Sequence, residues 1–157
     1  MDDYSLAQFH QFLDIMSRCV RTVSSEKAEE CGFKYYYIPF LLAIREHPCI
    51  SQKSLCECIP LDKSRVSIVV RELIRCGYVR NDSTGKVWSI SLTPSGEVVS
   101  KKAGEIVDDL NERLFTGIPE EDLKVFLSVM SKVAERADEI SAGSIYEPYV
   151  ADIRENS

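Results

Sequence analysis

The stretch Leu61-Asp62-Lys63-Ser64-Arg65-Val66-Ser67-Ile68-Val69-Val70-Arg71-Glu72-Leu73-Ile74-Arg75-Cys76-Gly77 decides the fold. Asp62 is a strong N-cap and Gly77 a common terminator, so the stretch predicts a helix that runs to about Cys76. One side of this helix is apolar, with Val66, Val69, Val70 and Leu73. The other side carries Ser64, Ser67, Ile68, Arg71 and Arg75. Such a helix buries one face and leaves the other to solvent or to a partner.

A shorter helix is predicted just before it. Ser51 can cap a helix over Ser51–Cys58, and Pro60 then breaks the chain. The residues of this helix expected to face inward are Leu55, Cys56 and Ile59. Two helices of this size joined by a turn of a few residues are typical of a helix-turn-helix.

The residues after Gly77 change period and predict a hairpin. Asn81-Asp82-Ser83-Thr84-Gly85 is turn chemistry, so Tyr78–Arg80 and Lys86–Leu92 are expected to pair as strands. Along the second strand, the side chains expected on a buried face are Trp88, Ile90 and Leu92. The order helix, turn, helix, hairpin is that of a winged helix-turn-helix, with the hairpin as the wing.

Long helices are expected on both sides of this lobe. The first helix should end at Gly32, and a buried helix should start near Pro39, with Tyr35 to Tyr37 leading into it. Thr93-Pro94 begins another helix, and the last one starts at about Glu120. The expected fold is mainly α with a small β-hairpin wing, in a single domain over 1–157. Within it, 33–93 form the winged lobe, 1–32 and 94–141 the dimerisation helices, and 142–157 a tail.

The terminal helices carry apolar stripes at steps of three and four residues, more than one winged lobe can cover. Burial of both stripes against a second copy would supply the driving force for a homodimer. The residues predicted to form this interface are Leu6, Phe9, Leu13, Met16, Val20, Phe126, Met130 and Val133.

The charge is unevenly distributed along the chain. The net charge of the 157 residues is -6, yet five basic and two acidic residues between Leu61 and Arg80 give this stretch a local +3. A basic patch on an acidic body suits the binding of a polyanion with one face.

The acidic start Met1-Asp2-Asp3 does not resemble a secretory signal, and the apolar run from Tyr35 to Ile44 is shorter than the roughly 20 residues of a membrane helix. A cytoplasmic protein with no membrane partner is expected.

Cysteine and histidine do not indicate a metal or a catalytic centre. There are six cysteines and two histidines, but no Cys-x2-Cys pair. Free thiols that pack as small hydrophobic groups are the favoured interpretation, against a disulfide framework or zinc. The sequence has no phosphate-binding glycine loop and no nucleophile–base motif, so neither a cofactor nor an enzyme is predicted.

The polar face of the helix after Asp62 suits the major groove of double-stranded DNA. Arginine can donate hydrogen bonds to guanine or to phosphates, and a serine hydroxyl can donate or accept. Ile68 can contact a thymine methyl. A merely solvated face is the alternative, and the apolar Ile68 together with the local +3 favours DNA. The residues predicted to contact DNA are Lys53, Ser54, Lys63, Ser64, Arg65, Ser67, Ile68, Arg71, Arg75, Arg80 and Lys86.

Four segments in this order and spacing resemble the MarR-type winged-helix regulators: Glu46-His47-Pro48-Cys49-Ile50-Ser51-Gln52, Leu61 to Ser67, Gly77-Tyr78-Val79-Arg80 and Leu92-Thr93-Pro94-Ser95-Gly96. The resemblance covers roughly Leu6 to Ile140. It implies a homodimer with interlaced first and last helices, two winged lobes on a palindromic operator, a transcriptional regulator acting as a repressor, and often a small ligand that loosens DNA binding.

The chain departs from the family pattern in two places. The family's wing usually carries an Asp-x-Arg stretch whose arginine enters the minor groove, whereas Lys86 is the cation near the tip of this short wing. The family's second helix also normally starts earlier than Pro39 permits.

The resemblance places a small aromatic or anionic effector near His10 and the tyrosines Tyr35, Tyr36 and Tyr37. One branch of the family senses peroxide through a cysteine near the start of the first helix. Cys19 lies deeper in that helix, and packing in the dimer seam is the favoured interpretation because no positive charge nearby would lower its pKa. A winged helix used for protein–protein contact, without DNA binding, is the alternative function.

Overall fold

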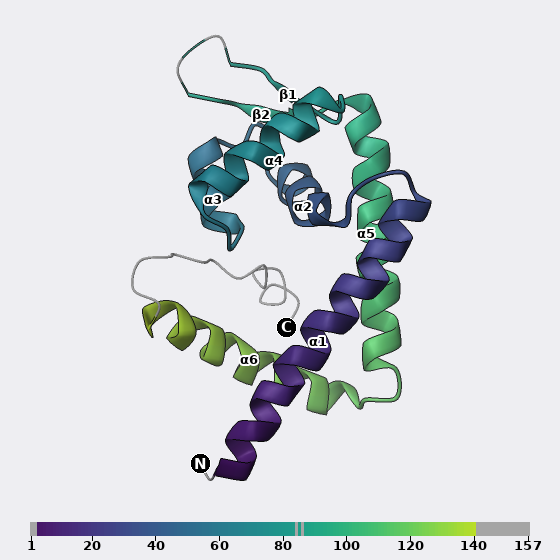
Figure 1. Cartoon of the computed structure of the whole chain (residues 1–157), viewed down its shortest axis with the longest axis vertical. Coiled ribbons are helices and arrows are strands. Elements are labelled where there is room, and N and C mark those ends of the chain that lie inside the picture. Colours follow the sequence, from purple (N-terminus) through teal and green to yellow (C-terminus); the bar gives the residue numbers. More distant parts are fainter. Residues whose placement is uncertain (1–2, 84, 86, 141–157) are drawn as a thin grey trace.

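The long helices extend from a small winged lobe (Figure 1). The computed structural model describes residues 3–83, 85 and 87–140. The long helices are α1 (Asp3–Glu30), α5 (Pro94–Phe115) and α6 (Glu120–Ile140). The lobe contains η1 (Tyr35–Tyr37), α2 (Ile38–Glu46), α3 (Gln52–Cys58), α4 (Lys63–Arg75) and the strands β1 (Val79–Asn81) and β2 (Ile90–Leu92). The prediction of a mainly α protein with a hairpin wing is confirmed.

The link between α1 and α2 is built as the sequence predicts. Gly32 adopts a left-handed conformation at φ +81°, and the amide of Phe33 bonds the carbonyl of Ala28 at 3.0 Å, which closes the end of α1. The single turn η1 follows, and Pro39 lies in the first turn of α2, where its missing amide proton costs no hydrogen bond. Tyr37 is buried, so this link is part of the core.

Side-chain caps define both helices of the helix-turn-helix. The hydroxyl of Ser51 accepts the amide of Ser54 at 3.0 Å, and the Asp62 carboxylate accepts the amide of Arg65 at 2.9 Å. Gly77, at φ +75°, ends α4. The core of the lobe lies around α2, which packs against α5, α3 and β2. Its largest fully buried side chains include Tyr37, Phe40, Leu41, Ile44, Leu55 and Leu73.

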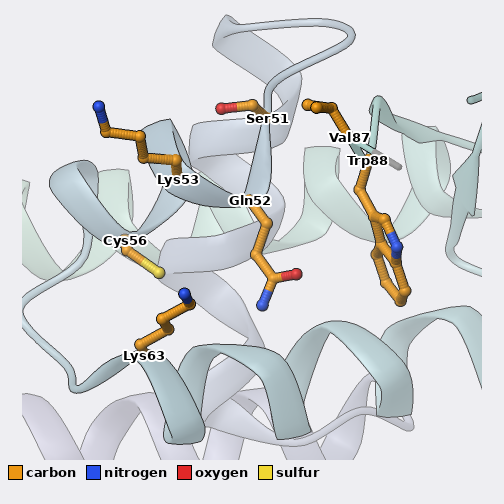
Figure 2. A pocket seen from close by; sticks show the side chains of 7 residues that line it. All are labelled: Ser51, Gln52, Lys53, Cys56, Lys63, Val87 and Trp88. Atoms are coloured by element: carbon orange, nitrogen blue, oxygen red, sulfur yellow. The ribbon is translucent and has the colours of Figure 1, made fainter. Parts of the chain in front are cut away.

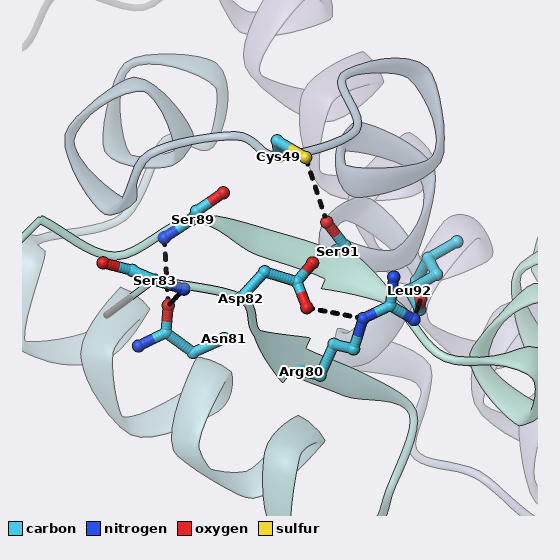
Figure 3. A network of polar contacts seen from close by, with 8 residues as sticks. All are labelled: Cys49, Arg80, Asn81, Asp82, Ser83, Ser89, Ser91 and Leu92. Carbon is cyan, nitrogen blue, oxygen red and sulfur yellow. Dashed lines mark hydrogen bonds and ion pairs between the residues drawn. The ribbon is translucent and has the colours of Figure 1, made fainter. Parts of the chain in front are cut away.

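The second strand of the wing is shorter than the sequence predicts, and the first strand lies one residue later, at Val79–Asn81 instead of Tyr78–Arg80. Val79 pairs with Leu92 and Asn81 with Ile90 in an antiparallel register, so the second strand begins at Ile90 and not at Lys86. The reason is the side chain of Asn81, whose Oδ1 accepts the backbone amides of Ser83 at 3.2 Å and Ser89 at 3.0 Å (Figure 3). The Asn81 side chain thereby supplies two hydrogen bonds beyond Ile90, beside the backbone bond from the amide of Asp82 to the carbonyl of Ser89 at 2.8 Å.

The predicted alternation of buried and exposed residues is also wrong at Ser91. Its side chain is buried, and its hydroxyl donates to the Cys49 sulfur at 3.5 Å (Figure 3). The amide of Ile90 bonds the carbonyl of Ile50 at 2.9 Å, which places the chain after α2 along the other edge of β2. The second edge of β2 is therefore also paired, and all three residues of the strand are buried.

The start of α5 is held against the end of α4. Thr93 caps α5 by accepting the amide of Gly96 at 3.1 Å, and the hydroxyls of Thr93 and Ser95 both donate to the carbonyl of Gly77. A Cβ on Gly96 would lie 1.8 Å from the carbonyl oxygen of Tyr78, so only glycine allows this approach.

At the other end of the molecule α6 meets the rest of the chain through aromatic rings. Phe126 packs edge-on against Phe12 of α1 at 6.5 Å between ring centroids, and against Phe115 of α5 at 6.2 Å. Within the described ranges, no helix has the length and apolar character needed to cross a membrane.

Candidate nucleic-acid interface

Helix α4 divides into two faces as predicted. Val66, Val70 and Leu73 are fully buried against the lobe. Ile68, on the opposite side, leaves 55% of its surface exposed. The polar side chains around it are exposed or half-buried: Ser64, Arg65, Ser67, Arg71 and Arg75. A single exposed apolar side chain is ordinary on a protein surface, so it is the serines and arginines around Ile68 that suit this face to contact with a polyanion.

Two hollows flank this face. Ile68, Arg71, Glu72 and Arg75 line a shallow depression of about 310 Å³ on α4 itself, and its two guanidinium groups make it cationic. A second hollow of about 350 Å³ lies between α3, the start of α4 and the wing (Figure 2). The residues lining this second hollow are Ser51, Gln52, Lys53, Cys56, Lys63, Val87 and Trp88.

The two lysines of the second hollow are placed differently. Lys63 points into it, whereas Lys53 points out to solvent (Figure 2), with 89% of its side chain exposed and a weak ion pair to Glu57 at 3.9 Å. Burial raises the pKa of the Cys56 thiol, and the charge of Lys63 only partly opposes this shift. A raised thiol pKa disfavours a reactive thiolate here.

Arg80 is committed to the wing. Its Nε donates to the Asp82 carboxylate at 2.7 Å, and its Nη1 donates to the carbonyl of Leu92 at 2.9 Å (Figure 3). The hydrogen bond from Arg80 lowers the pKa of Asp82. This guanidinium therefore first ties the two strands together, and only its remaining N–H groups are available to a phosphate. Lys86, the other predicted wing contact, lies outside the described residues.

Glu72 is a site residue that the sequence reasoning missed. Its Oε2 accepts hydrogen bonds from the Tyr37 hydroxyl at 2.8 Å, the Tyr36 hydroxyl at 3.0 Å and Lys34 Nζ at 3.2 Å. The bond from Tyr37, followed by those from Tyr36 and Lys34, lowers the pKa of Glu72. Burial, and then the bond to Glu72, raises the pKa of Tyr37. A signal was present in the sequence, because Glu72 is the one acidic residue within Lys63–Arg75 and stands beside arginine.

Several solved transcriptional regulators share this arrangement of helices and wing. A MarR transcriptional regulator from Methanosarcina mazei Go1 shares 20% identity and a TM-score of 0.74, over 89% of this chain and 94% of its own. The regulator SlyA shares 16% identity and a TM-score of 0.78, over 83% and 94%. A cysteine-to-serine variant of MarR from E. coli, solved with operator DNA, shares 16% identity and a TM-score of 0.71, over 85% and 99%.

The chain has the MarR fold. No protein-family model and no curated protein matches the sequence. The similarity therefore lies in the order and packing of the helices and strands. Different sequences can supply the caps, turns and buried positions that such elements need.

The predicted dimer face of this MarR fold is exposed in the single chain. On α1, Phe9, Leu13 and Val20 are 40%, 45% and 41% exposed, and on α6, Met130 and Val133 are 43% and 44% exposed. Met16 and Phe126 are half-buried, and the side chain of Leu6 lies outside the described part. Two further apolar side chains of α6 that the prediction omitted, Val125 and Val129, are more exposed still.

The predicted effector residues are not brought together within one chain. His10 lies in the first half of α1, and the tyrosines follow its far end, about 30 Å away at the 1.5 Å rise per helical residue. The hydroxyls of Tyr36 and Tyr37 bond Glu72, and Tyr35 is the exposed member of the three. Tyr36 and Tyr37 thus contact α4. Within one protomer the tyrosines lie too far from His10 to share a pocket with it.

All six cysteines are free thiols, and Cys19 is half-buried on α1. Among residues 3–83, 85 and 87–140, no three side chains of histidine, cysteine, aspartate or glutamate gather as a metal site would require.

Proposed function

We propose that this protein is a homodimeric transcriptional regulator that binds a palindromic operator in double-stranded DNA through α4. The observation that carries the proposal is the exposed face of α4, where Ile68 stands among Ser64, Arg65 and Arg71. A protein of the same fold, MarR from E. coli, was solved with operator DNA.

The N-terminal half of α4 reads bases. Ser64, Arg65, Ser67 and Ile68 lie in the first two turns of the helix, the part that enters the major groove most deeply in helix-turn-helix proteins. Arg65 provides a bidentate donor for guanine, and Ile68 an apolar contact for a thymine methyl.

Phosphates are held on both sides of this helix. Arg71 and Arg75 line the cationic depression further along α4, and Lys63 points into the hollow beneath the wing. Lys53 and Ser54 on α3, with Lys86 and the remaining N–H groups of Arg80 on the wing, complete the backbone contacts. Such contacts set the register of the protein on DNA, while the base contacts set the sequence.

A second copy covers the apolar face of α1 and α6. The resulting two-fold dimer requires a palindromic operator. Two-fold symmetry then requires half-sites whose centres are separated by about one helical turn, roughly 34–36 Å, or a multiple of it. Repression and release by a small aromatic or anionic effector stay predictions from the family resemblance, and a cytoplasmic location stays a prediction from the sequence.

The deciding experiment measures which fragments of the source genome the purified protein retains as the salt concentration rises. We expect retention of a few fragments, with affinity falling linearly in a double-logarithmic plot against salt. Arg65→Ala should cost about 1–3 kcal/mol per lost base contact and relax the sequence preference. Lys86→Ala should weaken all sequences alike, and by less, because a single lysine contributes one phosphate contact.

Lys132→Ala is the control, because it removes the same kind of exposed cation from α6, a helix at the end of the molecule opposite the wing (Figure 1). If the wild-type protein retains no fragment in a salt-dependent way, the DNA proposal is wrong, and a winged helix that contacts another protein takes its place.

A further inference from the structure

Helix α4 is tied to both of the helices that lead to the proposed dimer interface. At its end, the carbonyl of Gly77 accepts the hydroxyls of Thr93 and Ser95 at the start of α5. One turn earlier, Glu72 accepts three donors from the segment that follows α1. The recognition helix therefore has a polar connection to α5 and another to α1.

The second connection is unusual in its geometry. Lys34, Tyr36 and Tyr37 all direct a donor to one oxygen of Glu72, at 3.2, 3.0 and 2.8 Å. The rings of Tyr36 and Tyr37 pack edge-on at 5.0 Å, and the Lys34 ammonium lies 5.3 Å from the Tyr36 ring. A carboxylate oxygen with three directional donors fixes the position of its helix better than an apolar contact of the same size, which tolerates sliding.

The three donors are rigidly joined to α1. Phe33 is buried and bonds the last turn of α1, and Ala28 of that helix is fully buried against the lobe. A change in the direction of α1 thus moves the tyrosines, and the tyrosines move α4 through Glu72.

The negative charge of Glu72 is a second reason for the three donors around it. The carboxylate lies on the wall of the depression that contains Arg71 and Arg75, where an uncompensated negative charge would repel a phosphate. Lys34 neutralises it, and the tyrosines hold it against η1, so the depression stays cationic.

We propose that Glu72, held by Lys34, Tyr36 and Tyr37, is a specificity-determining positioning residue that sets the half-site spacing the dimer accepts. The inference rests on the proposed function, since it assumes a dimer on a two-fold DNA site. Glu72 itself makes no base contact in this arrangement. It fixes the angle between α4 and the dimerisation helices, and hence the separation of the two recognition helices.

The test uses the operator recovered from the retained genomic fragments and two versions with one base pair added or removed between the half-sites. One base pair moves a half-site by about 3.4 Å and turns it by about 35°. Wild-type protein should bind both altered duplexes about tenfold more weakly, within the usual range of coupling between sites. Glu72→Ala should bind the natural operator more weakly and reduce this spacing penalty to about threefold or less.

Conservative variants separate positioning from mere stability. Glu72→Gln keeps an acceptor for the tyrosines and should restore most of the spacing penalty, while Tyr36→Phe and Tyr37→Phe should each reduce it in part. Tyr35→Phe is the matched control in the same turn, because Glu72 bonds the hydroxyls of Tyr36 and Tyr37 but not that of Tyr35 in the described structure. Glu30→Gln is the matched control for charge, since its partner Lys27 lies on its own helix.

The inference is wrong if folded Glu72→Ala, Tyr36→Phe and Tyr37→Phe proteins discriminate between spacings as the wild type does. If Glu72→Ala does not fold, the single tyrosine variants decide, because each removes only a hydroxyl. Failure of the proposed function looks different, since the wild-type protein would then bind none of the three duplexes.

Discussion

At the scale of single residues, Gly96 shows how a close contact can reverse an ordinary substitution effect. Alanine normally stabilises a helix position relative to glycine by roughly 0.5–1 kcal/mol. Here a Cβ would lie 1.8 Å from the backbone oxygen of Tyr78, which cannot move without separating α5 from the end of α4. Gly96→Ala should therefore destabilise the protein by about 1–3 kcal/mol, as overpacking does, measured by urea unfolding.

Gly104→Ala, in the same helix, is the control. Its Cβ would meet the end of the flexible Arg45 side chain at 3.0 Å, and that guanidinium can shift. We expect a change within about 1 kcal/mol of zero, because helix propensity and the displaced contact offset each other. A Gly96→Ala protein as stable as the Gly104→Ala protein would contradict the role assigned to Gly96.

The lowered pKa of Glu72 predicts how its stabilising effect depends on pH. A carboxyl group whose pKa is lower in the folded state stabilises the fold above its unfolded pKa, here near 4.5, and loses that effect as pH falls towards the folded pKa. The difference in unfolding free energy between wild type and Glu72→Gln should be largest near neutral pH and shrink below pH 4.5. Denaturation at a series of pH values checks this, and a difference that grows with acidification would contradict it.

At the scale of elements, caps and breakers were readable from the sequence, and the wing was not. Ser51, Asp62, Thr93 and Gly77 act within one turn of the backbone, so their effect depends on local sequence alone. The wing depends on Asn81, whose side chain can pair with distant amides or remain in solvent, and only the folded chain shows which. The hydrogen bond from Ser91 to Cys49 likewise joins residues that are remote in sequence.

Removing the side-chain carboxamide of Asn81 should loosen the wing without unfolding the lobe. In Asn81→Ala the amides of Ser83 and Ser89 lose their acceptor, so we expect both to exchange with deuterium faster than in the wild type. The cost in global stability should stay within about 1–3 kcal/mol, because each of the two lost hydrogen bonds has a net value of about 0.5–1.5 kcal/mol. The amide of Ile90, bonded to Ile50, is the internal reference and should exchange as before. Unchanged exchange at Ser83 and Ser89 would show that Asn81 does not hold the wing.

At the scale of the whole molecule, sequence patterns indicate which residues face outward but not how far apart they lie. The apolar stripes of α1 and α6, predicted as a dimer interface, are exposed in the single chain, and period could indicate them because it is a local property. The grouping of His10 with the tyrosines stays a prediction for the dimer, because within one chain the 20 residues of continuous helix that follow His10, up to Glu30, separate what the resemblance placed together. The partnership of Glu72 with Tyr36 and Tyr37 spans more than 30 positions, and no periodicity reports such a contact.

The dimer prediction belongs to this scale. Leu13 is 45% exposed in the first half of α1, on the face that a second copy would cover. Leu13→Asp would place a charge in that interface, where it loses its hydration without gaining a partner. Sedimentation at micromolar concentration should show a dimer for the wild type and a monomer, or an unfolded chain, for this variant.

Val98→Asp is the matched control, because Val98 is a 59% exposed apolar residue near the start of α5, beside the winged lobe and outside the predicted interface. It should remain dimeric, with a melting temperature that rises with protein concentration as in the wild type, because association stabilises the folded state by mass action. The Leu13→Asp protein, where folded, should lose this concentration dependence. A wild-type protein that sediments as a folded monomer would remove both the dimer and the palindromic operator, since a single α4 can read only one half-site.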